Sequence, residues 1–260
     1  MLVLAIYNLK GNEALLAREL AAVLKRTVYE TSSRVRAPGG GPSVIASFPD
    51  REAARDAAEV LRARGFDLLL LDDGEIEADE RRFVVRSFEL GAEAAEVMRL
   101  ESRGGTLEVR YRDVDLLLRG NKIVALQPGA PRYTRQLSLT RAAATGGLVA
   151  TKPVREPRQP GTEEREGFLH LYGPGFPPLA WRETEIRYRA LGWTLLPSRQ
   201  ANFAQVAAEL RRRCPHAVYD ERLATRAGQA QLLGPTLAAA EHLDVAISVL
   251  AAALRQPAAP

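Results

Sequence analysis

The hydrophobic pattern changes its period at about residue 82, and this change constrains the fold more than any other feature. Before it, apolar runs such as 2–9 (LVLAIYNL) alternate with segments whose apolar residues recur at helical spacing, such as 12–26. After it, apolar and polar residues alternate within short segments, as in 106–120 (TLEVRYRDVDLLLRG). The first pattern indicates strand–helix units and the second indicates half-buried strands. The sequence therefore predicts an α+β chain with two domains.

Capping residues divide the first region into strand, helix, helix, strand, helix and strand. Asn12 is placed as the N-cap of a helix that reaches about residue 26. Thr27 and Glu30 form a capping box for a second, short helix. Asp50 caps a third helix, and Gly65 ends it. The strands are predicted at 2–9, 43–48 and 66–73.

Three consecutive glycines, Gly39–Gly41, raise the question of a phosphate-binding loop. Such a loop follows a strand and precedes a helix, so that helix N–H groups face the anion. Here the predicted order is reversed, and we expect a connector. A second glycine-rich stretch, 144–152 (ATGGLVATK), does not have the spacing of a phosphate loop either.

The element order of residues 2–73 resembles a small α/β fold. This fold is shared by the C-terminal domain of the bacterial ribosomal stalk protein and the Clp-protease adaptor that recognises N-terminal degrons. The resemblance is carried by LVLAIYN, by 12–36 (NEALLARELAAVLKRTVYETSSRVR) and by 49–72 (PDREAARDAAEVLRARGFDLLLLD). The Asn-Asp-Asp motif of the Clp adaptor is matched only by Asn8, so degron capture is not predicted.

The resemblance implies a non-catalytic docking module whose helix pair meets partners. The basic residues expected on that surface are the partner-binding candidates, namely Arg18, Lys25, Arg26 and Arg34. The alternative for these four residues is an ordinary solvated helix face.

Residues 83–220 are predicted to form an antiparallel β domain closed by one amphipathic helix. Across 82–220 this arrangement resembles the pleckstrin-homology-like barrel. Period-two segments at 167–173 and 179–193 are expected as strands, and 128–166 as a long, mobile insertion rich in Pro, Gly, Thr and Arg. The domain map is completed by a docking domain at 1–75, an acidic linker at 76–82, and a C-terminal helical segment at 221–260 with a helix at about 235–255.

Few residues have the type and spacing of a catalytic or metal-binding site. The single cysteine, Cys214, and nearby His216 lack the further donors of a zinc site, so we expect no metal, no cofactor and no catalytic residue. Cys214 is expected to be a small buried hydrophobe. The most unusual polar cluster is Ser198, Arg199 and Asn202. It is interpreted as a helix N-cap with its first turn, and the alternative is a loop that binds a ligand or anion.

Charge and composition favour a cytoplasmic protein that binds other proteins. The 36 basic and 32 acidic residues are interleaved, as in RETEIRYR, whereas nucleic-acid binders usually concentrate positive charge on one face. One cysteine and no leader-like N-terminus fit a reducing compartment. The leading hypothesis is a non-enzymatic adaptor or scaffold with an unknown protein partner. The alternatives are binding of nucleic acid or an anionic membrane through arginine-rich segments, self-association through the C-terminal helix, and an enzyme of unknown class.

Overall fold

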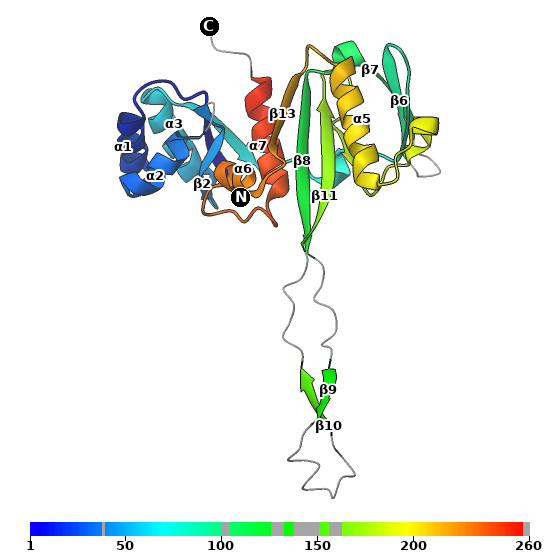
Figure 1. Ribbon diagram of the computed structural model, residues 1–260. Coiled ribbons are helices and arrows are strands. Elements are labelled where there is room, and N and C mark those ends of the chain that lie inside the picture. Colours follow the sequence, from blue (N-terminus) through cyan, green and yellow to red (C-terminus); the bar gives the residue numbers. More distant parts are fainter. Residues whose placement is uncertain (38–39, 100–104, 126–132, 138–150, 156–162, 257–260) are drawn as a thin grey trace, which may run out of the picture. The chain divides into compact units, whose positions relative to one another are not determined.

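The computed structural model describes residues 1–37, 40–99, 105–125, 133–137, 151–155 and 163–256 (Figure 1). The chain divides into two compact units, which are described separately. One unit comprises Met1–Lys122 together with Glu166–Pro260, and the other is Ile123–Arg165. The chain contains both helices and strands, which confirms the α+β class.

The N-terminal part of the larger unit has the predicted order of elements. These are β1 (Leu2–Tyr7), α1 (Glu13–Leu24), α2 (Val28–Val35), β2 (Ser43–Phe48), α3 (Arg51–Ala63) and β3 (Asp67–Asp72). The strands form an antiparallel sheet in the order β2-β1-β3. The predicted caps are confirmed, because Asn12 and Asp50 accept first-turn N–H groups and Thr27 forms a capping box with Glu30.

The glycine connector lies between α2 and β2, as predicted. Gly40 and Gly41 have φ angles of +76° and +109°, which favour glycine. The Leu9 N–H donates to the Gly40 carbonyl at 2.9 Å, and a Cβ on Gly40 would lie only 2.9 Å from the Leu9 nitrogen. The glycines therefore let the connector approach the end of β1 closely.

The remaining strands of the larger unit form two open sheets. A five-stranded sheet has the order β13-β8-β11-β12-β4, and a three-stranded sheet has the order β5-β6-β7. The strands are β4 (Phe83–Val85), β5 (Ser87–Leu90), β6 (Ala94–Met98), β7 (Thr106–Arg110), β8 (Leu116–Ala125), β11 (Glu163–Tyr172), β12 (Leu179–Arg182) and β13 (Val218–Leu223). Among the residues that the structure describes, the rest of this unit also contains the 3₁₀ segments η2 (Asp79–Arg81), η3 (Tyr111–Asp113) and η4 (Tyr188–Thr194), and the helices α5 (Arg199–Arg213), α6 (Arg226–Leu233) and α7 (Leu243–Arg255).

The prediction of a purely antiparallel domain is wrong for two strand pairs. β12 pairs with β4 in parallel, and β13 pairs with β8 in parallel. In each pair several other elements separate the two strands along the chain, with α5 among those between β8 and β13. A long connection of this kind allows parallel pairing, whereas a hairpin does not. The period-two pattern indicates strands but carries no information about their direction.

Two predicted boundaries also differ from the structure, and two elements were missed. The strand expected at 179–193 ends at Arg182, because the Glu185 and Ile186 N–H groups turn back to the Arg182 carbonyl. The C-terminal helix begins at Leu243 instead of about 235. The residues before it, which include buried Leu237, form turns. Strand β13 and helix α6 were not predicted.

The five-stranded sheet is buried on both faces. Leu116, Leu118 and Tyr172 face one core cluster, which also contains buried residues of β1, β3, α6 and α7. Leu117 and Leu169 face a second cluster, to which α5 and the three-stranded sheet contribute. The alternation of side chains along β8 and β11 thus supplies both clusters.

The sheet β2-β1-β3 is likewise covered on both faces. Leu4 and Ile6 pack with α1 and α3, whereas Val3 and Ala5 belong to the cluster that contains α7. Seven consecutive residues of α7, Val245–Ala251, are buried within the chain. The N-terminal strands therefore share a core with β8, β11 and α7. Self-association through the C-terminal helix stays a prediction.

The segment expected as an acidic linker, 76–82, makes contacts in the interior. The Glu77 N–H donates to Ser248 Oγ at 2.9 Å, and the Tyr172 hydroxyl donates to the Glu77 carboxylate at 2.9 Å. Arg82 is only 2% exposed and donates to Asp244 at 2.6 Å. These contacts tie the segment to β11 and α7, while the boundaries of the proposed domains stay a prediction.

The smaller unit contains an antiparallel pair, β9 (Tyr133–Leu137) and β10 (Thr151–Arg155). The predicted mobility of 128–166 falls mostly on residues outside the described ones, as does most of the glycine-rich stretch 144–152. Across the described part of the chain, no helix has the length and apolar character needed to cross a membrane.

Candidate functional site

The candidate site is a loop between β12 and α5 that exposes large apolar side chains. Trp193 is 96% exposed, Leu195 is 54% exposed and Leu196 is 43% exposed. We call residues 188–197 the tryptophan loop. Large apolar side chains that lie together on a surface mark sites of interaction, whereas isolated ones do not. This loop therefore has the character of a docking surface.

The base of the tryptophan loop is held by polar contacts to α5. Buried Asn202 accepts a hydrogen bond from the Leu196 N–H at 2.7 Å and donates one to the Leu196 carbonyl at 2.9 Å. The Gln205 amide donates to Thr194 Oγ1 at 3.0 Å. The Tyr188 hydroxyl donates to the Glu183 carbonyl at 2.8 Å. The apolar side chains thus project from an ordered base, which lowers the entropy lost on binding.

Three arginines lie in the tryptophan loop or next to it in the sequence. Arg187, Arg189 and Arg199 are exposed, and none of them forms an ion pair with a residue that the structure describes. Burial raises the pKa of Tyr188, the charges of Glu183 and Glu166 raise it further, and the charge of Arg199 lowers it, so Arg199 and two carboxylates lie close to this residue. The first turn of α5 contains no acidic residue, and the positive end of the helix dipole is therefore not neutralised there.

The polar cluster predicted from the sequence lies at this same place. Ser198 caps α5 by accepting the Ala201 N–H at 3.1 Å, which confirms the N-cap interpretation. Asn202 is occupied by the backbone of Leu196. Ser198 and Arg199 are exposed, and Asn202 is buried. Binding of a ligand or anion by this cluster stays a prediction, with two of its three side chains engaged in local structure.

The four basic candidates on the helix pair do not share one surface role. Arg18 and Lys25 are exposed and Arg26 is half-buried. Arg34 instead donates to the Gln231 carbonyl at 2.7 Å, and burial lowers the pKa of this side chain. Arg34 therefore contacts the segment of α6, where it holds α2 against the C-terminal part of the chain. Near the other three, Tyr29 of α2 is 90% exposed.

Cys214 lies at the end of α5 and is buried, as predicted. Burial raises the pKa of its thiol to about 11. His216 is exposed. Within the described ranges, no three or more His, Cys, Asp or Glu residues gather in a way that could hold a metal ion.

The sequence contained a signal for the tryptophan loop that the period-two interpretation missed. Gly192, with a φ angle of +52°, interrupts the alternation just before Trp193. Leu195 and Leu196 are followed by Pro197 and the N-cap residue Ser198, so a strand cannot continue there. A comparison with protein-family models, curated proteins and solved structures found no match to this chain. Its function is therefore inferred from its own residues.

Proposed function

We propose that this chain is a non-enzymatic adaptor of the cytoplasm that binds a protein partner through the tryptophan loop. The observation that carries the proposal is the 96% exposure of Trp193 on a loop whose base is anchored by Asn202 and Gln205. A large aromatic side chain left in water by an ordered loop gains most when a partner covers it. Tryptophan and arginine are also the residues that most often dominate the energy of protein interfaces.

The partner is expected to be a protein segment in which acidic residues flank an apolar centre. The apolar centre would cover Trp193, Leu195 and Leu196, and the acidic residues would face Arg187, Arg189 and Arg199. Complementary charge at the rim of an interface increases the association rate and the selectivity more than the affinity. The affinity should therefore depend mainly on Trp193.

A polyanion is a weaker match to this surface. The chain has 32 acidic residues against 36 basic ones, so positive charge is local and does not extend over the molecule. Nucleic-acid binding depends on several phosphate contacts and weakens steeply with salt. Nucleic acid and anionic membranes therefore remain the alternatives that the experiment must separate.

The element order of 2–72 supports the stalk-like docking module, with Tyr29 and the exposed basic residues of the helix pair as a second surface. The proposed pleckstrin-like arrangement of 82–220 has less support. Its described sheets are open, and two strand pairs are parallel.

The test is selection of peptides from a random display library on the full chain, followed by affinity measurement with purified peptides. We expect enriched peptides to combine acidic and apolar residues. We expect Trp193→Ala to weaken their binding by at least about tenfold, as for a hot-spot residue. Arg199→Glu should slow association with little change in dissociation.

Tyr29→Ala is the matched control, because it removes an equally exposed aromatic side chain from a different surface. It should leave unchanged the affinity of the peptides whose binding Trp193→Ala weakens, because Tyr29 belongs to the second surface. If Tyr29→Ala abolishes binding and Trp193→Ala does not, the helix pair is the docking surface and the proposal is wrong. The chain could also be retained on duplex DNA or on vesicles of anionic lipid. If Trp193→Ala abolishes that retention, the proposal of a protein partner is wrong.

A further inference from the structure

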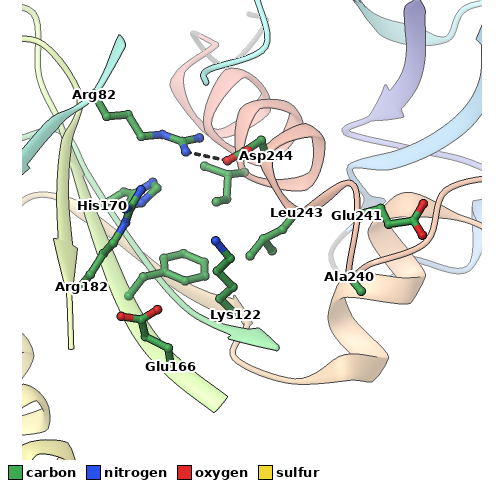
Figure 2. A pocket seen from close by; sticks show the side chains of 11 residues that line it. Arg82, Lys122, Glu166, His170, Arg182, Ala240, Glu241, Leu243 and Asp244 are labelled. Carbon is green, nitrogen blue, oxygen red and sulfur yellow. Dashed lines mark hydrogen bonds and ion pairs between the residues drawn. The ribbon is translucent and has the colours of Figure 1, made fainter. Parts of the chain in front are cut away.

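A cavity of about 160 Å³ lies between the five-stranded sheet and the first turn of α7 (Figure 2). Phe168 and His170 of β11 and Arg182 of β12 line it from the sheet, and Leu243 and Asp244 line it from α7. An apolar cavity of about 150 Å³ in a protein core is large enough to admit benzene. This cavity thus has room for a small organic molecule.

His170 is buried in the wall of the cavity without its full set of hydrogen bonds. Its side chain is 2% exposed, and its Nδ1 has no hydrogen-bond partner among the described residues. The ring lies between Phe168 and Tyr172, with ring centroids 5.0 and 6.4 Å away. Figure 2 shows the imidazole facing the space between the sheet and α7. Buried polar atoms almost always have a partner, so the cavity is expected to supply one.

The electrostatic environment of the imidazole is positive. Burial lowers the pKa of His170 well below its usual value, and the charges of Arg82 and Arg182 lower it further. Both arginines have carboxylate partners, since Arg82 donates to Asp244 at 2.6 Å and Arg182 donates to Glu185 at 2.9 Å. No carboxylate is among the groups that shift the pKa of His170 in the opposite direction. The arginine charges are thus compensated, and Glu166, Glu241 and Asp244 also line the cavity. A negative charge placed there would therefore be stabilised by hydrogen-bond donors and not by a net positive charge.

Two further donors reach the same space. Lys122 lines the cavity, and Figure 2 shows its ammonium group directed between the sheet and α7. Leu243 and Asp244 lie in the first turn of α7, where backbone N–H groups have no partner within the helix. The residue before the helix, His242, makes no side-chain capping bond to them. In the same view Glu241 is directed away from the other labelled side chains.

We propose that this cavity binds a small organic carboxylate with a compact apolar body. The carboxylate would accept hydrogen bonds from Lys122, from His170 in its Nδ1-protonated neutral form, and from the first turn of α7. The apolar body would lie against Phe168, Leu243 and Ile247, which line the cavity beside the polar groups. This mixture of apolar walls with a few converging polar groups is typical of small-molecule sites. The proposal is independent of the tryptophan loop, with which the cavity shares no residue.

The test follows the imidazole resonances of the full chain by NMR during titration with benzoate. The chain has only three histidines, and His170→Gln assigns the resonance of interest. We expect benzoate to shift the His170 resonances saturably, and to leave those of exposed His216 unchanged. Benzamide, which has the same shape without the charge, should produce no saturable shift.

Variants at Lys122 test the anion contact, because this side chain is exposed enough to be replaced without loss of the fold. Lys122→Met should weaken benzoate binding by at least tenfold, and Lys122→Arg should retain it. The absence of a saturable His170 shift with benzoate would overturn the proposal. An equal response to benzamide would overturn recognition of the carboxylate. A shift with inorganic phosphate alone would overturn the organic part of the assignment.

Discussion

Replacement of Leu250 by alanine tests whether the N-terminal sheet and the five-stranded sheet share one core. Leu250 is fully buried in α7, in the cluster that contains residues of β1, β3, β8 and β11. The change removes three carbons at about 0.8 kcal/mol each, or about 2.4 kcal/mol of transfer free energy. The residual cavity adds to this, and buried Leu→Ala changes cost about 2–5 kcal/mol in total. We expect a loss of about 3 kcal/mol, or roughly a hundredfold in the unfolding equilibrium.

Two probes on opposite sides of α7 measure this effect in a denaturant titration. Trp181 is fully buried in the five-stranded sheet, whereas Trp193 is already exposed, so the change of fluorescence on unfolding reports mainly on Trp181. Hydrogen exchange of the β1 amides reports on the N-terminal sheet. Because the core is shared, both probes should lose the same stability.

Val60→Ala on α3 is the control, since Val60 is 44% exposed and surface changes usually stay within about 0.5 kcal/mol. A loss of protection confined to β1, or a shift confined to the Trp181 transition, would refute the shared core. It would instead favour two domains that unfold separately, as the sequence alone predicts.

Two further predictions concern α5. The raised pKa of Cys214, about 11, leaves little thiolate at pH 8. Alkylation of this thiol by iodoacetamide should therefore be slow in the folded chain and fast in denaturant. Rapid labelling of the native protein would contradict the burial of Cys214. Hydrogen bonds from Arg212 and then Arg213 lower the pKa of Glu209 to about 2 from the usual 4.5. The charged carboxylate therefore stabilises the fold above about pH 4.5, and this contribution is lost as the pH falls towards 2. Glu209→Gln should reduce stability at pH 7 by less than about 1 kcal/mol, because Glu209 is only partly buried and Arg212 is exposed to solvent. In urea titrations the difference from the unchanged chain should narrow towards pH 3, and a constant difference would show that the charge is not responsible.

Local features of the chain could be predicted from the sequence. Asn12, Thr27 with Glu30, Asp50 and Ser198 all cap helices where predicted. Capping depends on one side chain and on backbone groups within three residues, so its signal is contained in a short window. The burial of Cys214 is also confirmed, because small apolar residues in the interior follow from composition and local pattern.

Contacts between distant segments could not be predicted from the sequence. Three features depend on residues that lie far apart in the chain. They are the parallel pairing of β4 and of β13, the contact of buried Arg82 with Asp244, and the hydrogen bond from Arg34 to the Gln231 carbonyl. Nothing in the sequence around Arg82 distinguishes it from an exposed arginine, because its partner lies on α7. The same holds for His170, whose environment is formed by Arg82 and Arg182.

By itself, the sequence determined the α+β class, the helix caps and the glycine connector, because these depend on neighbouring residues and on hydrophobic period. The tertiary structure decided that α7 packs against both sheets, that Trp193 stands exposed on an anchored loop, and that a cavity opens beside His170. These properties depend on which surfaces pack together in the folded chain. The sequence shows that a segment has an apolar face, but only the fold decides whether another element covers that face.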